Sequence, residues 1–220
     1  MKIKIKIFSC VVVFFSLVSA GYSLTGDEAV GYFSAVFEEK VNTFKADVLQ
    51  TVAVSDLEAP QKLKGRLVLK KPDKFSVEYI EPRQQVKCNG KNVWIYMEAE
   101  NQVLVQDLKD LNAKDNILFG FNSFINKLKK NYINSIVSKD NSRDLVEVEA
   151  LPREGETGLS KIRLVIDSLR WLPVGITVYY SETNYISVVF SNQTVNEKVR
   201  DEIFEFKTPE GAIIINTPIK

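Results

Sequence analysis

The sequence predicts a mainly β protein with a few helices, in which a single strongly curved antiparallel sheet forms an open barrel. After residue 42, apolar residues alternate with polar ones in about ten short segments, as in strands with one apolar and one hydrated face. Turn signals such as Asn89-Gly90 separate neighbouring segments. Two other stretches have helical spacing, and the concave face of the sheet is where those helices can bury their apolar sides.

The first twenty residues have the composition of a secretory signal peptide. Lys2, Lys4 and Lys6 form a basic start, an apolar run follows, and cleavage is expected after Ala20. A retained membrane anchor is the alternative, but the run is short for a bilayer. Cys10 lies inside the apolar run rather than at its end, so we expect an unlipidated mature protein in the periplasm.

The rest of the chain, residues 21–220, is expected to be one domain, because it contains no linker, repeat or low-complexity tract. Removing the three lysines of the signal lowers the formal net charge from +1 to −2. This balance excludes a nucleic-acid-binding surface of the usual basic kind and gives little attraction to an anionic membrane. We expect a monomer.

The first element of the mature chain is an amphipathic helix over Asp27–Val41. Val30, Phe33 and Phe37 share one helical face, and the acidic start suits the helix dipole. Strands joined by tight turns follow it. They are expected at Thr43–Val52, Lys62–Lys71, Lys74–Tyr79, Gln85–Cys88, Lys91–Met97 and Gln102–Gln106.

The middle of the chain, Asp115–Asn131, predicts two short helices with a break at Gly120. Asn122 or Ser123 is the expected N-cap of the second helix. Strands then resume. They are expected at Tyr132–Ser138, Asp144–Ala150, Ser160–Asp167, Pro173–Tyr180, Tyr185–Ser191 and Glu202–Lys207.

The sequence lacks the residues of most catalytic and metal sites. It has no histidine, and a lone mature cysteine, Cys88, can form neither a disulfide nor a zinc site, so packing is its expected role. No Gly-rich phosphate loop is present, and the basic run Lys62–Lys71 fits a hydrated strand face. Carboxylates fall at polar strand positions or in loops, where solvation explains them: Asp47, Glu78, Glu98, Asp107, Asp110 and Asp144. We expect no enzyme activity, no metal and no cofactor.

The apolar faces of the strands leave two alternatives open. They could line a cavity suited to acyl chains, or they could form a dry core. Alternation alone does not distinguish the two.

The order of short motifs along the mature chain resembles the periplasmic outer-membrane lipoprotein carrier family, LolA. Each motif is weak alone, and the resemblance depends on their succession over nearly the whole chain. The matching residues are Phe44, Leu49 (or Val48) and Gln50; Gly65, Leu67, Lys71, Pro72 and Phe75; Asn89, Gly90, Lys91, Trp94 and Tyr96; Gln102 and Val103; and Phe204, Phe206, Pro209 and Gly211.

The resemblance implies an unclosed β-barrel covered by a helical lid, with a cavity for the acyl chains of lipoproteins. It also implies an inner-membrane ABC transporter that releases the cargo and an outer-membrane receptor that accepts it. The residues then expected to line the cavity are Leu67, Leu69, Phe75, Val77, Tyr79, Trp94 and Tyr96. The inward face of the 91–97 strand stays open, because Val93 and Ile95 on its other face are apolar too. The residues expected on the lid are Ile117, Leu118, Phe121 and Phe124.

The chain departs from the family pattern at Lys71, where the family usually has an arginine thought to hold the lid through backbone contacts. Lysine makes fewer simultaneous hydrogen bonds, so Lys71 is a candidate lid latch of altered strength. A proline expected near Ala113–Asp115 is also missing. A lipid-binding envelope sensor, or a carrier of another lipid with the same fold, is the alternative function. An enzyme acting on lipids would need a nucleophile–base pair that the sequence lacks.

Overall fold

The computed structural model describes residues 23–110, 121–154 and 158–216. The expected signal peptide lies outside the described residues. So does the first of the two short helices expected in the middle of the chain.

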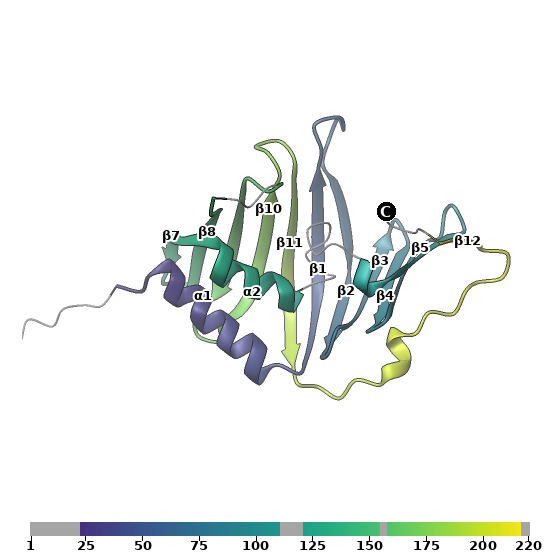
Figure 1. Cartoon of the computed structure of the whole chain (residues 1–220), viewed down its shortest axis with the longest axis horizontal. Coiled ribbons are helices and arrows are strands. Elements are labelled where there is room, and N and C mark those ends of the chain that lie inside the picture. The colour runs from purple at the N-terminus through teal and green to yellow at the C-terminus, as the bar shows by residue number, and fades with distance from the viewer. Residues whose placement is uncertain (1–22, 111–120, 155–157, 217–220) are drawn as a thin grey trace, which may run out of the picture.

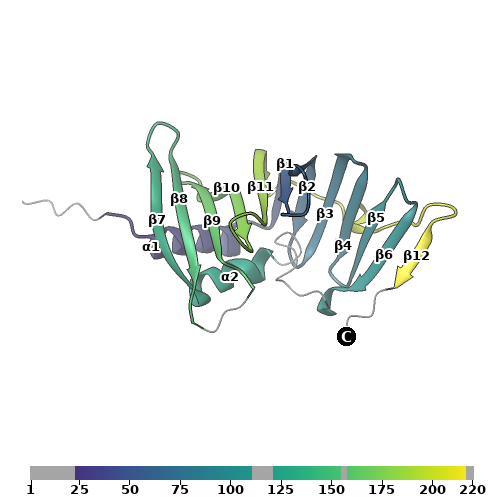
Figure 2. The same ribbon diagram turned by 90° about the horizontal axis from the view of Figure 1, so that it is seen from above.

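Within these ranges, twelve strands form one sheet, which is curved and unclosed as predicted (Figures 1 and 2). Their order is β12-β6-β5-β4-β3-β2-β1-β11-β10-β9-β8-β7. Every neighbouring pair is antiparallel except β12 and β6, which are parallel. The strands are β1 (Thr43–Ala53), β2 (Gln61–Lys70), β3 (Lys74–Glu81), β4 (Gln84–Asn89), β5 (Asn92–Met97), β6 (Gln102–Asp107), β7 (Tyr132–Asp140), β8 (Leu145–Pro152), β9 (Lys161–Asp167), β10 (Leu172–Tyr179), β11 (Tyr185–Val195) and β12 (Ile213–Asn216).

The sheet consists of two antiparallel meanders, β1–β6 and β7–β11, that meet along β1. This strand pairs with β2 on one edge and with β11 on the other. Both β1 and β11 are 11 residues long. Because β1 has partners on both edges, the two meanders share one continuous hydrogen-bonded sheet.

The predicted N-terminal helix is confirmed as α1 (Gly26–Ala35), which continues into a π-helical turn, η1 (Val36–Lys40). A capping box fixes its start, because Thr25 accepts a hydrogen bond from the Glu28 amide and Glu28 accepts one from the Thr25 amide. Ala29, Val30 and Phe33 are buried against the sheet.

The second helix, α2 (Phe121–Asn131), lies with α1 over the β7–β11 half of the concave face (Figure 1). Its side chains Phe124, Ile125 and Leu128 join the same core as those of α1. No helix within the described part of the chain is long and apolar enough to span a bilayer.

The strand predicted at Glu202–Lys207 is wrong. Asp201–Phe204 form a 3₁₀ turn, η3, within an extended segment, residues 196–212, that crosses the convex face of β1–β5 as a strap and ends in β12. The alternation that suggested a strand is real, since Phe204 is fully buried and Glu205 is exposed. It arises because the strap packs one side on the sheet, not because it pairs with a neighbouring strand.

Gly65 in β2 gives a test of how closely β2 and β3 approach. A Cβ at this position would lie 2.4 Å from the Glu78 carbonyl oxygen, next to a register shift between Lys64 and Gly65. We expect Gly65→Ala to lower the free energy of unfolding by about 2–3 kcal/mol, because the backbone must move to admit the methyl group. Urea denaturation measures this change. Gly31→Ala is the control, since a Cβ there meets nothing within 4 Å; equal effects in both variants would contradict the close approach.

Candidate ligand-binding face and its latch

The strand register fixes which side chains share the concave face of β1–β6. In one row across the sheet, an apolar residue of each strand is paired directly with an apolar residue of the neighbouring strand. This central row consists of Ala46, Leu67, Val77, Val86, Ile95 and Leu104. A second row beside it consists of Phe44, Leu69, Phe75, Cys88 and Val93. Apolar side chains therefore extend without a break across several strands.

The two rows are closed off from water over most of their length. Leu67 and Val77 are fully buried and belong to one hydrophobic cluster with the helices. Ile95 and Leu104, nearer the β6 edge, are partly exposed. Access to this face therefore increases toward the edge formed by β6 and β12.

The next row along the strands, which runs from Val48 through Tyr79 to Gln102, is partly polar. The Tyr79 hydroxyl donates a hydrogen bond of 2.5 Å to Gln50 Oε1, and Gln84 and Gln102 lie at the same level on β4 and β6. Burial raises the pKa of the Tyr79 phenol. The apolar surface thus ends at a row that can form hydrogen bonds.

Five of the predicted cavity residues lie together on the concave face; Trp94 and Tyr96 do not. The five are Leu67, Leu69, Phe75, Val77 and Tyr79. Trp94 and Tyr96 project from the convex face and pack against Phe206 of the strap, with ring centroids 6.3 and 5.8 Å apart. Both faces of β5 are apolar, so alternation could not decide between them. Val93 and Ile95 occupy the concave side instead.

The predicted lid residues are only partly described. Ile117 and Leu118 lie outside the described residues, and so does the side chain of Phe121, the first residue of α2. Phe124 is buried in the core.

Lys71 holds the end of the N-terminal helical segment. Its Nζ donates hydrogen bonds to the carbonyl oxygens of Phe37 (2.5 Å) and Glu38 (2.7 Å) in η1. Carbonyls at a helix C-terminus lack helical partners and carry partial negative charge, which suits a cation. Burial lowers the pKa of Lys71, and the charge of Glu38 opposes this change.

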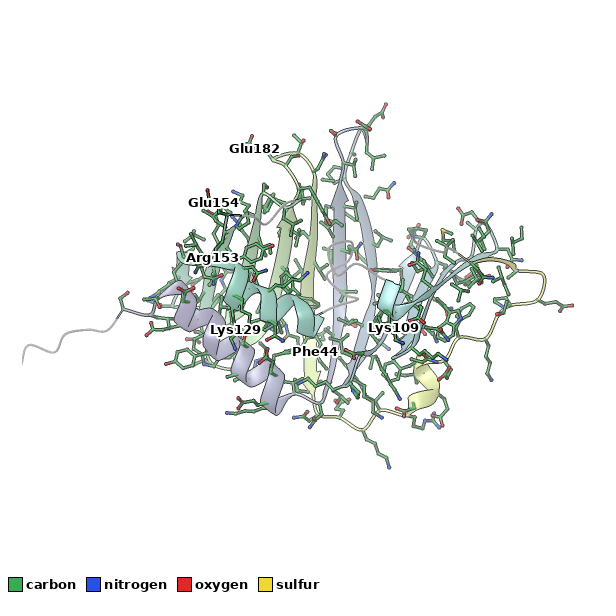
Figure 3. The ribbon with its side chains drawn as sticks, viewed as in Figure 1. Phe44, Lys109, Lys129, Arg153, Glu154 and Glu182 are labelled. Atoms are coloured by element: carbon green, nitrogen blue, oxygen red, sulfur yellow. The ribbon has the colours of Figure 1, made fainter. Side chains whose placement is uncertain are left out.

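Lys71, the candidate lid latch, therefore contacts η1 directly. Its link to α2 is indirect and passes through Glu38 of η1. The Glu38 carboxylate lies 4.0 Å from Lys129 of α2. Figure 3 labels Lys129, beside α1. Sequence reasoning missed Glu38. Its position one helical turn after Ser34, at the edge of the apolar face, is the signal that could have identified it.

Cys88 has the surroundings of a packing residue. Its thiol donates to the Asp73 carbonyl at 3.2 Å and accepts from the Gly90 amide at 3.4 Å. Burial raises its pKa to about 11, so the reactive thiolate is scarce near neutral pH. Among the residues described, no three Cys, Asp or Glu side chains are grouped so as to hold a metal ion.

Two hollows open on the convex face, with volumes of about 530 and 450 Å³. Both are lined by Asp47 and Arg66, and the larger also lies beside Lys45, Glu197 and other charged residues of the strap. Charged linings of this kind do not suit an acyl chain. The concave rows remain the best candidate for an apolar ligand.

An unclosed sheet whose concave face carries continuous apolar rows is typical of proteins that shelter apolar ligands. The chain belongs to the family described as outer membrane lipoprotein carrier protein LolA, whose model matches residues 39–207. The resemblance found in the sequence motifs is thus confirmed.

Individual relatives are distant. An outer-membrane lipoprotein carrier protein from Nitrosomonas europaea is 26% identical over 183 residues, which cover 81% of this chain and 85% of that protein. An uncharacterized protein from Methanocaldococcus jannaschii is 24% identical over 182 residues, but the match spans only 50% of its length. A solved structure of an uncharacterized conserved protein from Thermus thermophilus shares the fold, with a TM-score of 0.56, 11% identity, and coverage of 86% of this chain and 99% of that one.

The buried phenol of Tyr79 gives a pH-dependent prediction. Its folded-state pKa is raised above the unfolded value of about 10, so the neutral hydroxyl contributes stability below pH ~10, and this contribution is lost as the pH rises further. We expect Tyr79→Phe to cost about 1 kcal/mol at pH 7, through loss of the hydrogen bond to Gln50. The decline in stability from pH 9 to 11 should also be shallower than in the wild type. Urea titrations at several pH values measure both effects, and parallel profiles would contradict the assignment.

Proposed function

We propose that the protein is a periplasmic carrier that shelters the acyl chains of lipoproteins on the concave face of β1–β6. The observation that carries this proposal is the unbroken central row from Ala46 to Leu104, which is long, apolar and increasingly accessible toward the β6 edge. Membership of the LolA family, with relatives named as lipoprotein carriers, supports it.

The gain from sheltering an acyl chain is large. A buried methylene contributes about 0.8 kcal/mol, so a sixteen-carbon chain gains roughly 10 kcal/mol before the costs of ordering and opening. Leu67 and Val77 are already buried in the closed protein, so cargo must displace the atoms that cover them. This competition lowers the net affinity and allows release.

The direction of lipoprotein transport would come from the partners, since the described residues carry no nucleotide-binding loop. An inner-membrane ABC transporter would release the lipoprotein to the carrier. An outer-membrane receptor with higher affinity for the same acyl chains would then remove it. In this scheme Lys71 stabilises the closed state by holding η1, which in turn meets α2.

A matched pair of variants tests the proposed face. Ile95 and Val105 are partly buried residues on adjacent strands, and the register places them on opposite faces. We expect Ile95→Asp to weaken binding of a fluorescent acyl probe by about tenfold or more, because a carboxylate would then contact the chain. Val105→Asp should leave binding within about twofold. Thermal melts would verify that both variants fold, and equal losses in the two would refute the concave face as the site.

Substitutions at Lys71 test the latch. Lys71→Arg should favour the closed state, since guanidinium can bond several carbonyls at once, and Lys71→Leu should favour the open one. A hydrogen bond to a charged group contributes about 1.5–3 kcal/mol, enough to change the lid equilibrium tenfold. Uptake of a labelled lipoprotein and its hand-over to outer membranes are measured separately. We expect slower uptake for Lys71→Arg and poorer hand-over for Lys71→Leu. If the wild type and both variants behave alike at both steps, Lys71 is not a latch.

A further inference from the structure

A line of polar side chains runs along one edge of the apolar face of α1 and η1. Asp27, Ser34 and Glu38 follow one another at intervals of seven and four residues, which places them above one another on the helix. With Asn134 of β7 and Lys129 of α2 they form what we call the polar seam. Contacts between the two helices place α1 beside α2 along this edge (Figure 1).

The two ends of the polar seam are in contact with α2. At one end, Asn134 Nδ2 donates to Asp27 Oδ1 at 2.9 Å and to the Leu128 carbonyl at 3.0 Å. At the other end, the Glu38 carboxylate and the Lys129 ammonium are 4.0 Å apart, which is the outer limit of an ion pair. These two contacts bracket Ser34.

Three oxygens in the polar seam are buried without a hydrogen-bond partner among the described residues: Ser34 Oγ, Glu38 Oε1 and Asn134 Oδ1. Ser34 is fully inaccessible, and Asn134 is only 7% exposed. A buried polar atom that loses its water and gains no partner opposes the closed arrangement. Elsewhere α2 buries Phe124, Ile125 and Leu128 in an apolar core. The docking of α2 therefore combines a favourable apolar contact with an unfavourable polar one.

We infer that Ser34 and Glu38 are positioning residues that keep α2 loosely docked, so that the helix can move aside when an acyl chain enters the concave face of the sheet. Separation of α2 from α1 returns these oxygens to water, which offsets part of the apolar contact that is lost. A fully apolar seam would hold α2 closed against the cargo. This inference rests on the proposed carrier function and assigns the tuning of its lid to the helix–helix contact, a place separate from the acyl-binding rows.

Ser34→Ala tests the inference, because it removes one unpartnered oxygen and leaves the rest of the side chain. We expect amide hydrogen exchange at Phe124–Leu128 to slow by about tenfold, with uptake of a fluorescent acyl probe slowed to a similar extent. Gly31→Ala is the matched control. It also raises the helix propensity of α1, but its Cβ would meet nothing within 4 Å, so exchange in α2 should stay as in the wild type.

The exchange measurement separates the two hypotheses. Unchanged or faster exchange in α2 of Ser34→Ala would overturn the role of the polar seam, whether or not the protein binds acyl chains. So would an equal slowing in Gly31→Ala, because helix propensity alone would then explain the effect. If the wild-type protein takes up no acyl probe but exchange in Ser34→Ala slows as expected, the proposed carrier function is refuted. The loose docking of α2 is still supported.

Discussion

The pairing of β1 on both of its edges is the interaction on which the rest of the structure depends. The hydrogen bonds to β2 and β11 join two separate meanders into one sheet, and they set the register from which every later strand is counted. A displacement of one residue in this register would exchange the two faces of a strand. Ala46 and Phe44 would then point outward, and neither apolar row would exist.

Much of the fold could be predicted from the sequence, since alternation and turn residues are local signals. Asn89-Gly90 marks a hairpin because few other residues adopt the required backbone angles, and the helix over Asp27–Val41 follows from spacing alone. The strap could not be recognised in this way. Its residues alternate as a strand does, and only the packing of Phe206 on Trp94 and Tyr96 shows that the partner is a face and not an edge.

The candidate site was predictable to the extent that one face of a strand was clearly more apolar. This was so for Leu67, Leu69, Phe75 and Val77, because lysine, arginine or glutamate occupies several positions on the other face of β2 and β3. It failed on β5, whose two faces are both apolar because each is covered. The contact of Glu38 with Lys129 joins segments distant in sequence, so the local pattern indicates only that Glu38 lies at the edge of the apolar helical face and not which residue it meets.

The strap also has a consequence for how the protein reaches its folded state. Asn196 at its start donates to the Lys40 carbonyl and accepts from the Asn42 amide, so the segment that leads to the last strand is fastened beside the C-terminal end of η1. The parallel strand β12 covers the edge of β6, yet it lies far along the chain from its partner. During synthesis, the β6 edge therefore stays exposed until the C-terminal residues have been made. An unpaired edge beside an apolar face is a site of aggregation, so the order in which the chain is synthesised creates an interval in which a new molecule would need protection by other factors.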